Sequence, residues 1–329
     1  MSHQRQMYVE IEDWPLVRPF VISRSRDLKA EVVVVRLLEG GVQGWGESTP
    51  YARYDETPSS VVASIETRRA AIESGAEVSM TELGLQGAAA NAVDCALIDL
   101  ACKRSRTPAW ALLNQREPGP LLTTATLVLG TPEAMAAEAR QYAEFRLLKV
   151  KLGAGDADIA RLEAIRNVRP DARLICDANE GWNVSQLEKY ADSLARLGVE
   201  MVEQPCPAGA DDGLRGLKLP IAVCADESCH TAKDVEGLMG KYDLVNIKLD
   251  KAGGIRGALE LAASAQTHNM GIMVVCMLAT SLAMAPAVLV AQKARYVDLD
   301  GPLALTRDRK HPMTYREGQV FPAQPDLWG

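Results

Sequence analysis

Three carboxylates stand where short apolar runs of the sequence end. Asp177, Glu203 and Asp226 close three successive runs, with stretches of similar length between them. If the fold brings them into one cavity, they would repel one another strongly unless a cation neutralises them. All-oxygen ligands, with no histidine or thiolate among them, favour Mg²⁺ over zinc, with Mn²⁺ as a substitute. The sequence therefore predicts one divalent metal ion at these three residues.

Three lysines occupy equally unusual places. Lys149 and Lys151 lie within one apolar run, on one face by two-residue alternation, and Lys248 ends another run. Burying an ammonium group is costly unless it is paired or its pKa falls. A carboxylate substrate held by the metal would present its α-carbon to a lysine on each side. We interpret Lys151 and Lys248 as the acid and base, and Lys149 as an ion-pair partner of the ligands or a substrate-oxygen contact.

The elements that position these residues follow from the hydrophobic pattern. From about residue 121, short apolar runs alternate with amphipathic stretches, which is typical of parallel βαβ units. Eight strands closing into a barrel, with one helix in each gap, would gather their end residues at one rim. Cys176 and Cys224, next to the ligands, are expected on the other face of the barrel wall. The eight runs are Thr124–Leu129, Leu147–Leu152, Leu174–Ala178, Met201–Glu203, Ile221–Ala225, Leu244–Lys248, Gly271–Val275 and Tyr296–Leu299.

The region before the barrel has a different pattern. Residues 31–38 and 42–47, joined by Gly40-Gly41, predict a β-hairpin, and residues 59–73 and 86–103 have helical periodicity. The hairpin glycines do not match a phosphate-binding fingerprint, because their spacing differs and no suitable lysine and helix follow. This region is therefore a smaller α+β unit beside the barrel.

Composition excludes several classes of protein. The chain has 329 residues, a formal net charge of −7 and a pI near 5.3, so we expect neither nucleic-acid nor membrane binding. Seven scattered cysteines suggest neither disulfides nor zinc. The polar start lacks the apolar core of a signal peptide, which favours the cytoplasm. The uncharged stretch Met270–Ala291 is interpreted as a buried strand and helix, because Thr280-Ser281 and Pro286 interrupt it.

Five motifs follow one another in order along the barrel region. They are LLKVKLG at 147–153, DANEGW at 177–182, VEQP at 202–205, ADES at 225–228 and NIKLDKAGG at 246–254. In order and spacing they resemble the muconate-lactonizing subgroup of the enolase superfamily, and VDLDGP after CML resembles the L-Ala-D/L-Glu (dipeptide) epimerases within it. The similarity covers nearly the whole chain, including WPLVRPFVISR near its start.

This resemblance implies a fold and roles for particular residues. The fold would be a modified (β/α)8 barrel, of (β/α)7β type, at residues 119–301, with an α+β capping domain at 1–118 and a tail at 302–329 that returns to the cap. Asp177, Glu203 and Asp226 would hold one Mg²⁺, with Asn179 and Glu227 supporting them. The lysine pair would carry out 1,1-proton transfer through an enediolate. The resemblance further implies a small dipeptide substrate and a place in murein peptide metabolism, and it leaves a homo-oligomer open.

The resemblance also implies which residues recognise the substrate. In the dipeptide epimerases the D-x-D motif, here Asp298 and Asp300, receives the N-terminal ammonium of the substrate, as paired carboxylates suit a multiply donating cation. Thr126 and the backbone of Cys276 would line the same end of the pocket. An acidic side chain on the substrate would need a cation from the cap.

Arg24 and Arg26 are the candidates for that cation, and the sequence does not choose between them.

Other activities also stay open: an N-acylamino acid racemase, or an o-succinylbenzoate synthase or cycloisomerase of the same subgroup. The run ending at Cys276 carries no histidine, which disfavours a histidine-based racemase. A Schiff-base aldolase would leave the three carboxylates unexplained, and a ligand-binding barrel without catalysis would leave the lysine pair unexplained.

Overall fold

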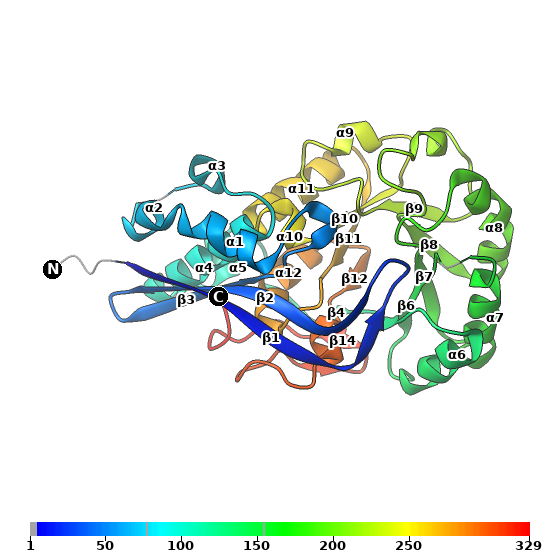
Figure 1. Ribbon diagram of the computed structural model, residues 1–329, viewed down its shortest axis with the longest axis horizontal. Coiled ribbons are helices and arrows are strands. Elements are labelled where there is room, and N and C mark those ends of the chain that lie inside the picture. Colours follow the sequence, from blue (N-terminus) through cyan, green and yellow to red (C-terminus); the bar gives the residue numbers. More distant parts are fainter. Residues whose placement is uncertain (1–4, 77, 154) are drawn as a thin grey trace.

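The computed structural model of the chain describes residues 5–76, 78–153 and 155–329. It has two parts: a cap of antiparallel strands and short helices, at the left of Figure 1, and a barrel of parallel strands with helices around it. The first four residues of the polar start lie outside the described residues. The predicted combination of an α/β barrel and an α+β cap is confirmed.

The sheet of the cap has three antiparallel strands. They are β1 Gln6–Val21, β2 Arg26–Glu39 and β3 Val42–Ser48. The predicted hairpin is confirmed as β2 and β3, whose turn at Gly40 and Gly41 has positive φ at both residues. The pattern did not predict β1, an edge strand with exposed acidic residues and an irregular register between Pro15 and Phe20.

One long helix, α4, and four short ones pack near this sheet, and α4 approaches β3 closely. The alanine-rich α4 confirms the helix predicted over 86–103, and the helical pattern predicted over 59–73 is confirmed as two helices, α1 and α2, with a break at Thr67 and Arg68. Gly44 and Gly46 of β3 lie so close to α4 that a Cβ at Gly46 would come within 2.1 Å of the Ala92 carbonyl oxygen. The helices are α1 Pro58–Glu66, α2 Arg69–Glu73, α3 Met80–Leu83, α4 Gly87–Ser105 and α5 Ala109–Leu112, with a 3₁₀ turn at Ala52–Tyr54.

All eight predicted barrel strands are present and lie side by side in sequence order. The backbone N–H of Thr124 donates to the carbonyl of Val297 at 3.0 Å, which links the first strand to the last and closes the barrel. The strands are β5 Ala125–Leu127, β6 Leu147–Lys151, β7 Arg173–Asp177, β8 Val199–Glu203, β9 Ala222–Ala225, β10 Leu244–Ile247, β11 Gly271–Val275 and β12 Tyr296–Asp298. Because β6 and β10 are four strands apart in this order, they face each other across the barrel.

Helices outside the barrel cover the strands (Figure 1). The expectation of one helix per gap is wrong between β8 and β9, where the described residues form only a 3₁₀ turn, Asp212–Leu214. The helix α8 begins with a capping box, in which the Asn183 side chain and Gln186 each bond the other's backbone N–H. The helices are α6 Pro132–Gln141, α7 Asp158–Val168, α8 Val184–Arg196, α9 Val235–Leu238, α10 Leu249–Ala252, α11 Ile255–Thr267 and α12 Ser281–Ala291.

The alternation of strand side chains corrects one prediction about the cysteines. Cys176 packs outward, in the large core between the strands and the helices, as expected. Cys224 instead belongs to the cluster inside the barrel, with Met201 and Leu244. It lies two residues before Asp226 and therefore shares the inward face of that ligand. Both thiols are buried and free of disulfides.

The tail continues past the barrel and back to the cap. After a 3₁₀ turn at Gly301–Ala304, β13 Tyr315–Arg316 and β14 Gln319–Val320 form a small sheet with β4 Leu121–Leu122. Trp328 then donates its indole N–H to the carbonyl of Cys95 in α4, at 3.1 Å. The boundaries at residues 118 and 301 stay a prediction.

The uncharged stretch 270–291 forms a strand and a helix, as predicted. It contains β11 and α12, and Pro286 lies inside the buried α12. Across the described ranges, no helix is both long enough and apolar enough to cross a membrane.

Candidate active site

The three predicted metal ligands lie together at the carboxyl ends of neighbouring strands. Asp177 ends β7 and pairs in register with Glu203, which ends β8, and Asp226 follows β9. All three are buried, with no more than 1% of their surface exposed. Parallel strands that end at one rim of a barrel bring their last residues together, which explains the convergence.

Each of the two proposed catalytic lysines contacts one of these carboxylates. The ammonium of Lys151 lies 2.6 Å from Asp177 Oδ2, and that of Lys248 lies 2.6 Å from Asp226 Oδ2. Glu203 lies on the strand between them. The lysines therefore stand on opposite sides of the carboxylate group, as their strands β6 and β10 require.

Lys149 lies deeper and joins several acids. Its ammonium lies 2.7 Å from Glu203 Oε2, 2.8 Å from Asp298 Oδ2 and 3.4 Å from Asp177 Oδ2. Only 1% of this lysine is exposed, and the carboxylates around it hold its pKa well above the usual range against the effect of burial. The ion-pair interpretation of Lys149 agrees with these contacts.

The three carboxylates differ in how far nearby ammonium groups offset their negative charge. Burial opposes ionisation of Asp177, but the ammonium groups of Lys151 and Lys149 lower its pKa to about 2. Burial and the charge of Asp177 raise the pKa of Glu203 to about 8. Asp226, held by Lys248 and Lys251, has a pKa well below its usual range. Of the three carboxylates, Glu203 is therefore the one whose ionised form nearby cations stabilise least.

The donor set suits a hard divalent cation. Buried side-chain oxygens without a hydrogen-bond partner include Asn179 Oδ1, Glu227 Oε2 and Asn246 Oδ1, and Glu203 Oε2 has only the ion pair with Lys149. Within the described residues, no three acidic, histidine or cysteine side chains stand at the spacing of a ready-made metal site, and lysines contact two of the three predicted ligands, Asp177 and Asp226. A cation would replace those ammonium groups as the counter-charge. All-oxygen donors of this kind fit Mg²⁺.

The D-x-D pair lies at the end of β12, where the predicted lining residues meet it. Asp298 Oδ1 accepts from the Thr124 hydroxyl at 2.6 Å and from that of Thr126 at 3.4 Å. Asp300 Oδ2 accepts from the backbone N–H of Thr126 at 2.6 Å. The backbone N–H of Cys276 donates to the carbonyl of Asp298 at 2.9 Å. Asp298, Asp300, Thr126 and Cys276 are thus brought together.

A nearby cation offsets the negative charge of Asp298 but not that of Asp300. Lys149 lowers the pKa of Asp298, although burial opposes this. Burial and the neighbouring Asp298 raise the pKa of Asp300 to about 8. A second cation beside Asp300 would relieve this repulsion.

The structure distinguishes between the two cap arginines. Arg24 reaches over the rim, where it contacts Glu227 and donates to the carbonyl of Asn179 at 3.0 Å. Arg26 is exposed at the start of β2, paired in register with Val21. Arg24 is thus the arginine that joins the predicted supporting residues Asn179 and Glu227.

Sequence reasoning missed several residues of the site. Lys251 binds Asp226 with its ammonium 2.6 Å from both Oδ1 and the backbone carbonyl. It lies within NIKLDKAGG, three residues after Lys248, so a second lysine on one helical turn was the available signal. Tyr51, in the cap, belongs to no sequence pattern that pointed to the site. Its hydroxyl oxygen nevertheless accepts a hydrogen bond from Arg24 Nη2 at 2.8 Å.

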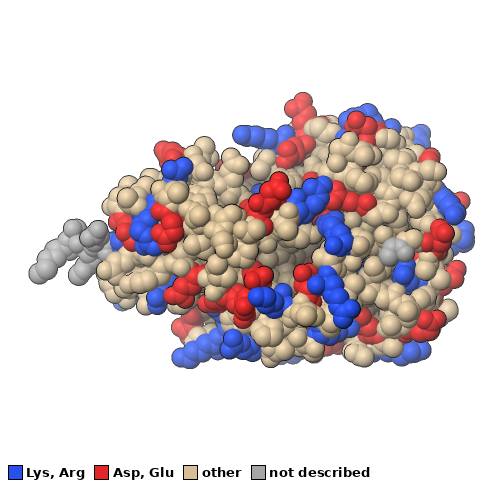
Figure 2. Space-filling view, viewed as in Figure 1, with Lys and Arg blue, Asp and Glu red and all other residues tan. Residues whose placement is uncertain are grey.

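Backbone strain marks the same rim. Asn179, Glu180 and Gln204 are non-glycine residues with positive φ, at 44°, 64° and 33°. The backbone N–H of Glu180 donates to the carbonyl of Gln204 at 2.9 Å, which ties the loops after β7 and β8 together. Strain of this kind is concentrated at functional sites. Figure 2 shows acidic and basic side chains gathered around the hollow between cap and barrel.

Comparison with known families decides the classification. The model for "Mandelate racemase / muconate lactonizing enzyme, N-terminal domain" matches residues 4–114, and "Enolase C-terminal domain-like" matches residues 134–325. The chain belongs to the enolase superfamily. It is an isomerase of the racemase and epimerase type that acts on amino acid derivatives.

Individual relatives resemble the chain along almost its whole length. It is 43% identical to L-Ala-D/L-Glu epimerase of Escherichia coli, over 96% of this chain and 99% of that one. It is 44% identical to N-acetyl-D-glutamate racemase of a Pseudoalteromonas species, over 91% and 95%. A crystal structure of an enolase family member from Agrobacterium tumefaciens, with homology to dipeptide epimerases and with bound sodium and L-Ala-L-Glu, superposes with a TM-score of 0.96 at 43% identity, covering 99% and 100%.

Proposed function

We propose that this enzyme is a Mg²⁺-dependent L-Ala-D/L-Glu epimerase that inverts the α-carbon of the C-terminal residue by proton transfer between Lys151 and Lys248. The observation that carries the proposal is the placement of these lysines on opposite sides of the buried carboxylates, each within 2.6 Å of one of them. Inversion requires one group to remove a proton from one face and another to deliver a proton to the opposite face.

The residues divide the work between binding and proton transfer. Asp177, Glu203 and Asp226 would hold one Mg²⁺, which when bound would stabilise the negative charge that develops on the substrate carboxylate. In each direction one lysine, neutral, takes the α-proton, and the other, protonated, supplies the replacement. Asn179 and Glu227 would orient the ligands, and Lys149 would hold Glu203 and Asp298 in place.

The ends of the dipeptide would be recognised by opposite charges. The substrate ammonium would lie at Asp298 and Asp300, where it would relieve the repulsion that raises the pKa of Asp300. The acidic side chain of a C-terminal glutamate would lie at Arg24, whose position over the rim supports this choice over Arg26. Thr126 and the backbone of Cys276 complete the ammonium end of the pocket.

A second candidate is racemisation of N-acetylglutamate, which the similarity to the Pseudoalteromonas racemase favours. An acylated amine carries no charge and needs no carboxylate partner. The pair Asp298 and Asp300 therefore supports the free dipeptide as the substrate, while Arg24 would serve a glutamate side chain in either case.

The deciding experiment incubates the enzyme with Mg²⁺ in deuterium oxide and follows α-deuterium by mass spectrometry. The substrates are a dipeptide library that includes L-Ala-L-Glu and L-Ala-D-Glu, with N-acetyl-L-glutamate alongside. We expect deuterium incorporation and epimerisation in the L-Ala-Glu pair, and slower turnover of N-acetylglutamate. Equal or faster turnover of N-acetylglutamate would transfer the assignment to the racemase. Parallel reactions with Mn²⁺ test its substitution for Mg²⁺.

A further inference from the structure

The short helix α10 and the residue before it carry three charged side chains, two to one barrel carboxylate and the third to the cap. Lys248, the residue just before it, reaches Asp226 Oδ2, and Lys251 reaches Asp226 Oδ1, each at 2.6 Å. The backbone N–H of Lys251 also donates to the carbonyl of Lys248 at 3.1 Å, so the two lysines share one rigid turn. The third side chain, Asp250, points away from the barrel interior.

Asp250 binds the cap. Its Oδ1 accepts from the backbone N–H of Thr49 at 2.9 Å and from the side-chain amide of Asn91 at 2.8 Å. Thr49 follows the last strand of the cap sheet, and Asn91 lies on α4. The turn that carries Lys248 is thus held from two sides, by a metal-ligand candidate in the barrel and by two donors of the cap.

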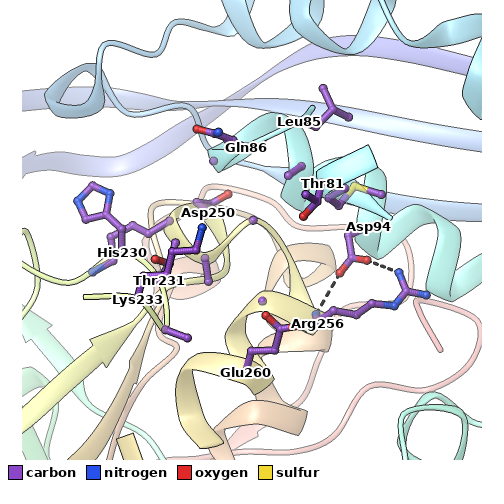
Figure 3. Close-up of a pocket in the computed structure, with 18 of the residues that line it drawn as sticks. Thr81, Leu85, Gln86, Asp94, His230, Thr231, Lys233, Asp250, Arg256 and Glu260 are labelled. Atoms are coloured by element: carbon purple, nitrogen blue, oxygen red, sulfur yellow. Dashed lines mark hydrogen bonds and ion pairs between the residues drawn. The ribbon is translucent and has the colours of Figure 1, made fainter. Parts of the chain in front are cut away.

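The packing around this turn leaves little freedom. A Cβ at Gly253 would come within 3.4 Å of Ala90 on α4, and one at Gly254 would come within 2.6 Å of the Asp94 Cβ. Figure 3 shows Asp250 on the wall of a groove between cap and barrel, together with the bonded pair Asp94 and Arg256. Asp94 accepts from the backbone N–H of Arg256 at 3.1 Å, at the start of α11.

The environment of Asp250 is not that of a stabilising ion pair. Both of its hydrogen-bond donors are neutral, and burial, with Glu56 and Glu47 nearby, raises its pKa to about 7. A half-buried carboxylate without a cation beside it costs stability. The two hydrogen bonds of Asp250 instead fix the orientation of its turn relative to the cap.

We infer that Asp250 is a positioning residue that aligns Lys248 with the substrate by fixing its turn against the cap at Thr49 and Asn91. The inference rests on the proposed function. It has a consequence that general stabilisation of the cap would not have. Lys248 serves one face of the α-carbon and Lys151 the other, so a loss of alignment at Lys248 should impair only the epimer that Lys248 deprotonates.

The test measures solvent exchange separately for each epimer. Lys248→Ala first identifies which epimer of L-Ala-Glu depends on Lys248 for α-deuterium exchange. Asp250→Ala should slow exchange of that same epimer by up to about 100-fold, as a misplacement of about 1 Å can. Exchange of the other epimer, through Lys151, should stay close to wild type. Asp250→Asn, whose amide oxygen still accepts both bonds, should restore most of the rate.

Two further variants keep the test decisive. Asn91→Ala removes one donor from the cap side and should give the same one-sided loss, even if Asp250→Ala fails to fold. Asp94→Asn is the matched control, because it weakens the same interface at α11 and not at the turn of Lys248. It should lower thermal stability without separating the two epimers.

The outcomes distinguish the inference from the proposed function. Equal slowing of both epimers in Asp250→Ala and Asn91→Ala would overturn the positioning role and leave only a structural one. Wild-type exchange rates for both epimers in both variants would also overturn it. Absence of exchange in the wild-type enzyme would reject the proposed function itself, and the inference with it.

Discussion

The substitution Asp300→Asn tests how the substrate ammonium is recognised. Asparagine keeps the shape of the side chain, and its oxygen can still accept from the backbone N–H of Thr126, which Asp300 binds at 2.6 Å. Only the charge is lost. A charge-assisted hydrogen bond contributes about 2 kcal/mol, which corresponds to roughly 30-fold in kcat/KM. Asp298 is a less selective target, because its charge also binds Lys149.

The assay compares kcat/KM for L-Ala-L-Glu and N-acetyl-L-Ala-L-Glu, in wild type and Asp300→Asn, at about pH 8. Wild type should discriminate against the acetylated dipeptide, and the variant should lose most of that discrimination. The free dipeptide should therefore suffer nearly the whole loss, and the acetylated one little. If both substrates lose activity by the same factor, Asp300 does not bind the ammonium. The same conclusion follows if wild type turns over both equally.

Four further predictions follow from the same structure. Chelation of Mg²⁺ and Glu203→Gln should each abolish turnover while circular dichroism shows a retained fold; near-normal turnover of the variant without metal would contradict the metal assignment. Lys151→Ala and Lys248→Ala should each lose epimerisation, measured by polarimetry. Each should still exchange the α-hydrogen of the epimer that its remaining lysine deprotonates, so the two variants should keep exchange of opposite epimers. Wild-type epimerisation in either variant would reject the two-base scheme. The folded state raises the pKa of Asp300 from 3.8 to about 8, so it retains a proton that the unfolded state loses between these values. This group's contribution to stability should fall as pH rises to about 8, and thermal melts should show a smaller decline in Asp300→Asn. Gly46→Ala should lower stability by about 2 kcal/mol or more in denaturant titration, because its methyl group would meet the α4 backbone; an unchanged midpoint would contradict this packing.

The barrel could be predicted because its strands are buried on both faces. Such strands appear in sequence as apolar runs, and the polar residues that end them mark the rim. The edge strand β1 escaped prediction, since exposed acidic residues and Pro15 interrupt its pattern. The break between α1 and α2 was missed because no proline or glycine marks it in the sequence.

The position of the candidate site could be predicted because its residues lie at the ends of predicted strands. Strand ends located the carboxylates and lysines, and the structure brings those residues together, although their catalytic roles stay predictions. Contacts between cap and barrel could not be predicted, since Asp250 and Asn91 are far apart in sequence and nothing in the motif around Asp250 or the helix around Asn91 indicates that they meet. The choice of Arg24 over Arg26 depends on the loop between β1 and β2, whose direction only the folded cap defines.

The contact between Trp328 and α4 affects the order in which the chain can mature during synthesis. Trp328 and its acceptor Cys95 are 233 residues apart, and Gly329 also donates to Asp99 on α4 at 2.7 Å. The ribosome therefore releases α4 long before the residues that cover it. That side of the nascent cap stays open while the barrel strands are made, and long-range contacts of this kind form slowly. The cap therefore cannot complete its packing against Trp328 and Gly329 until the barrel strands have been synthesised.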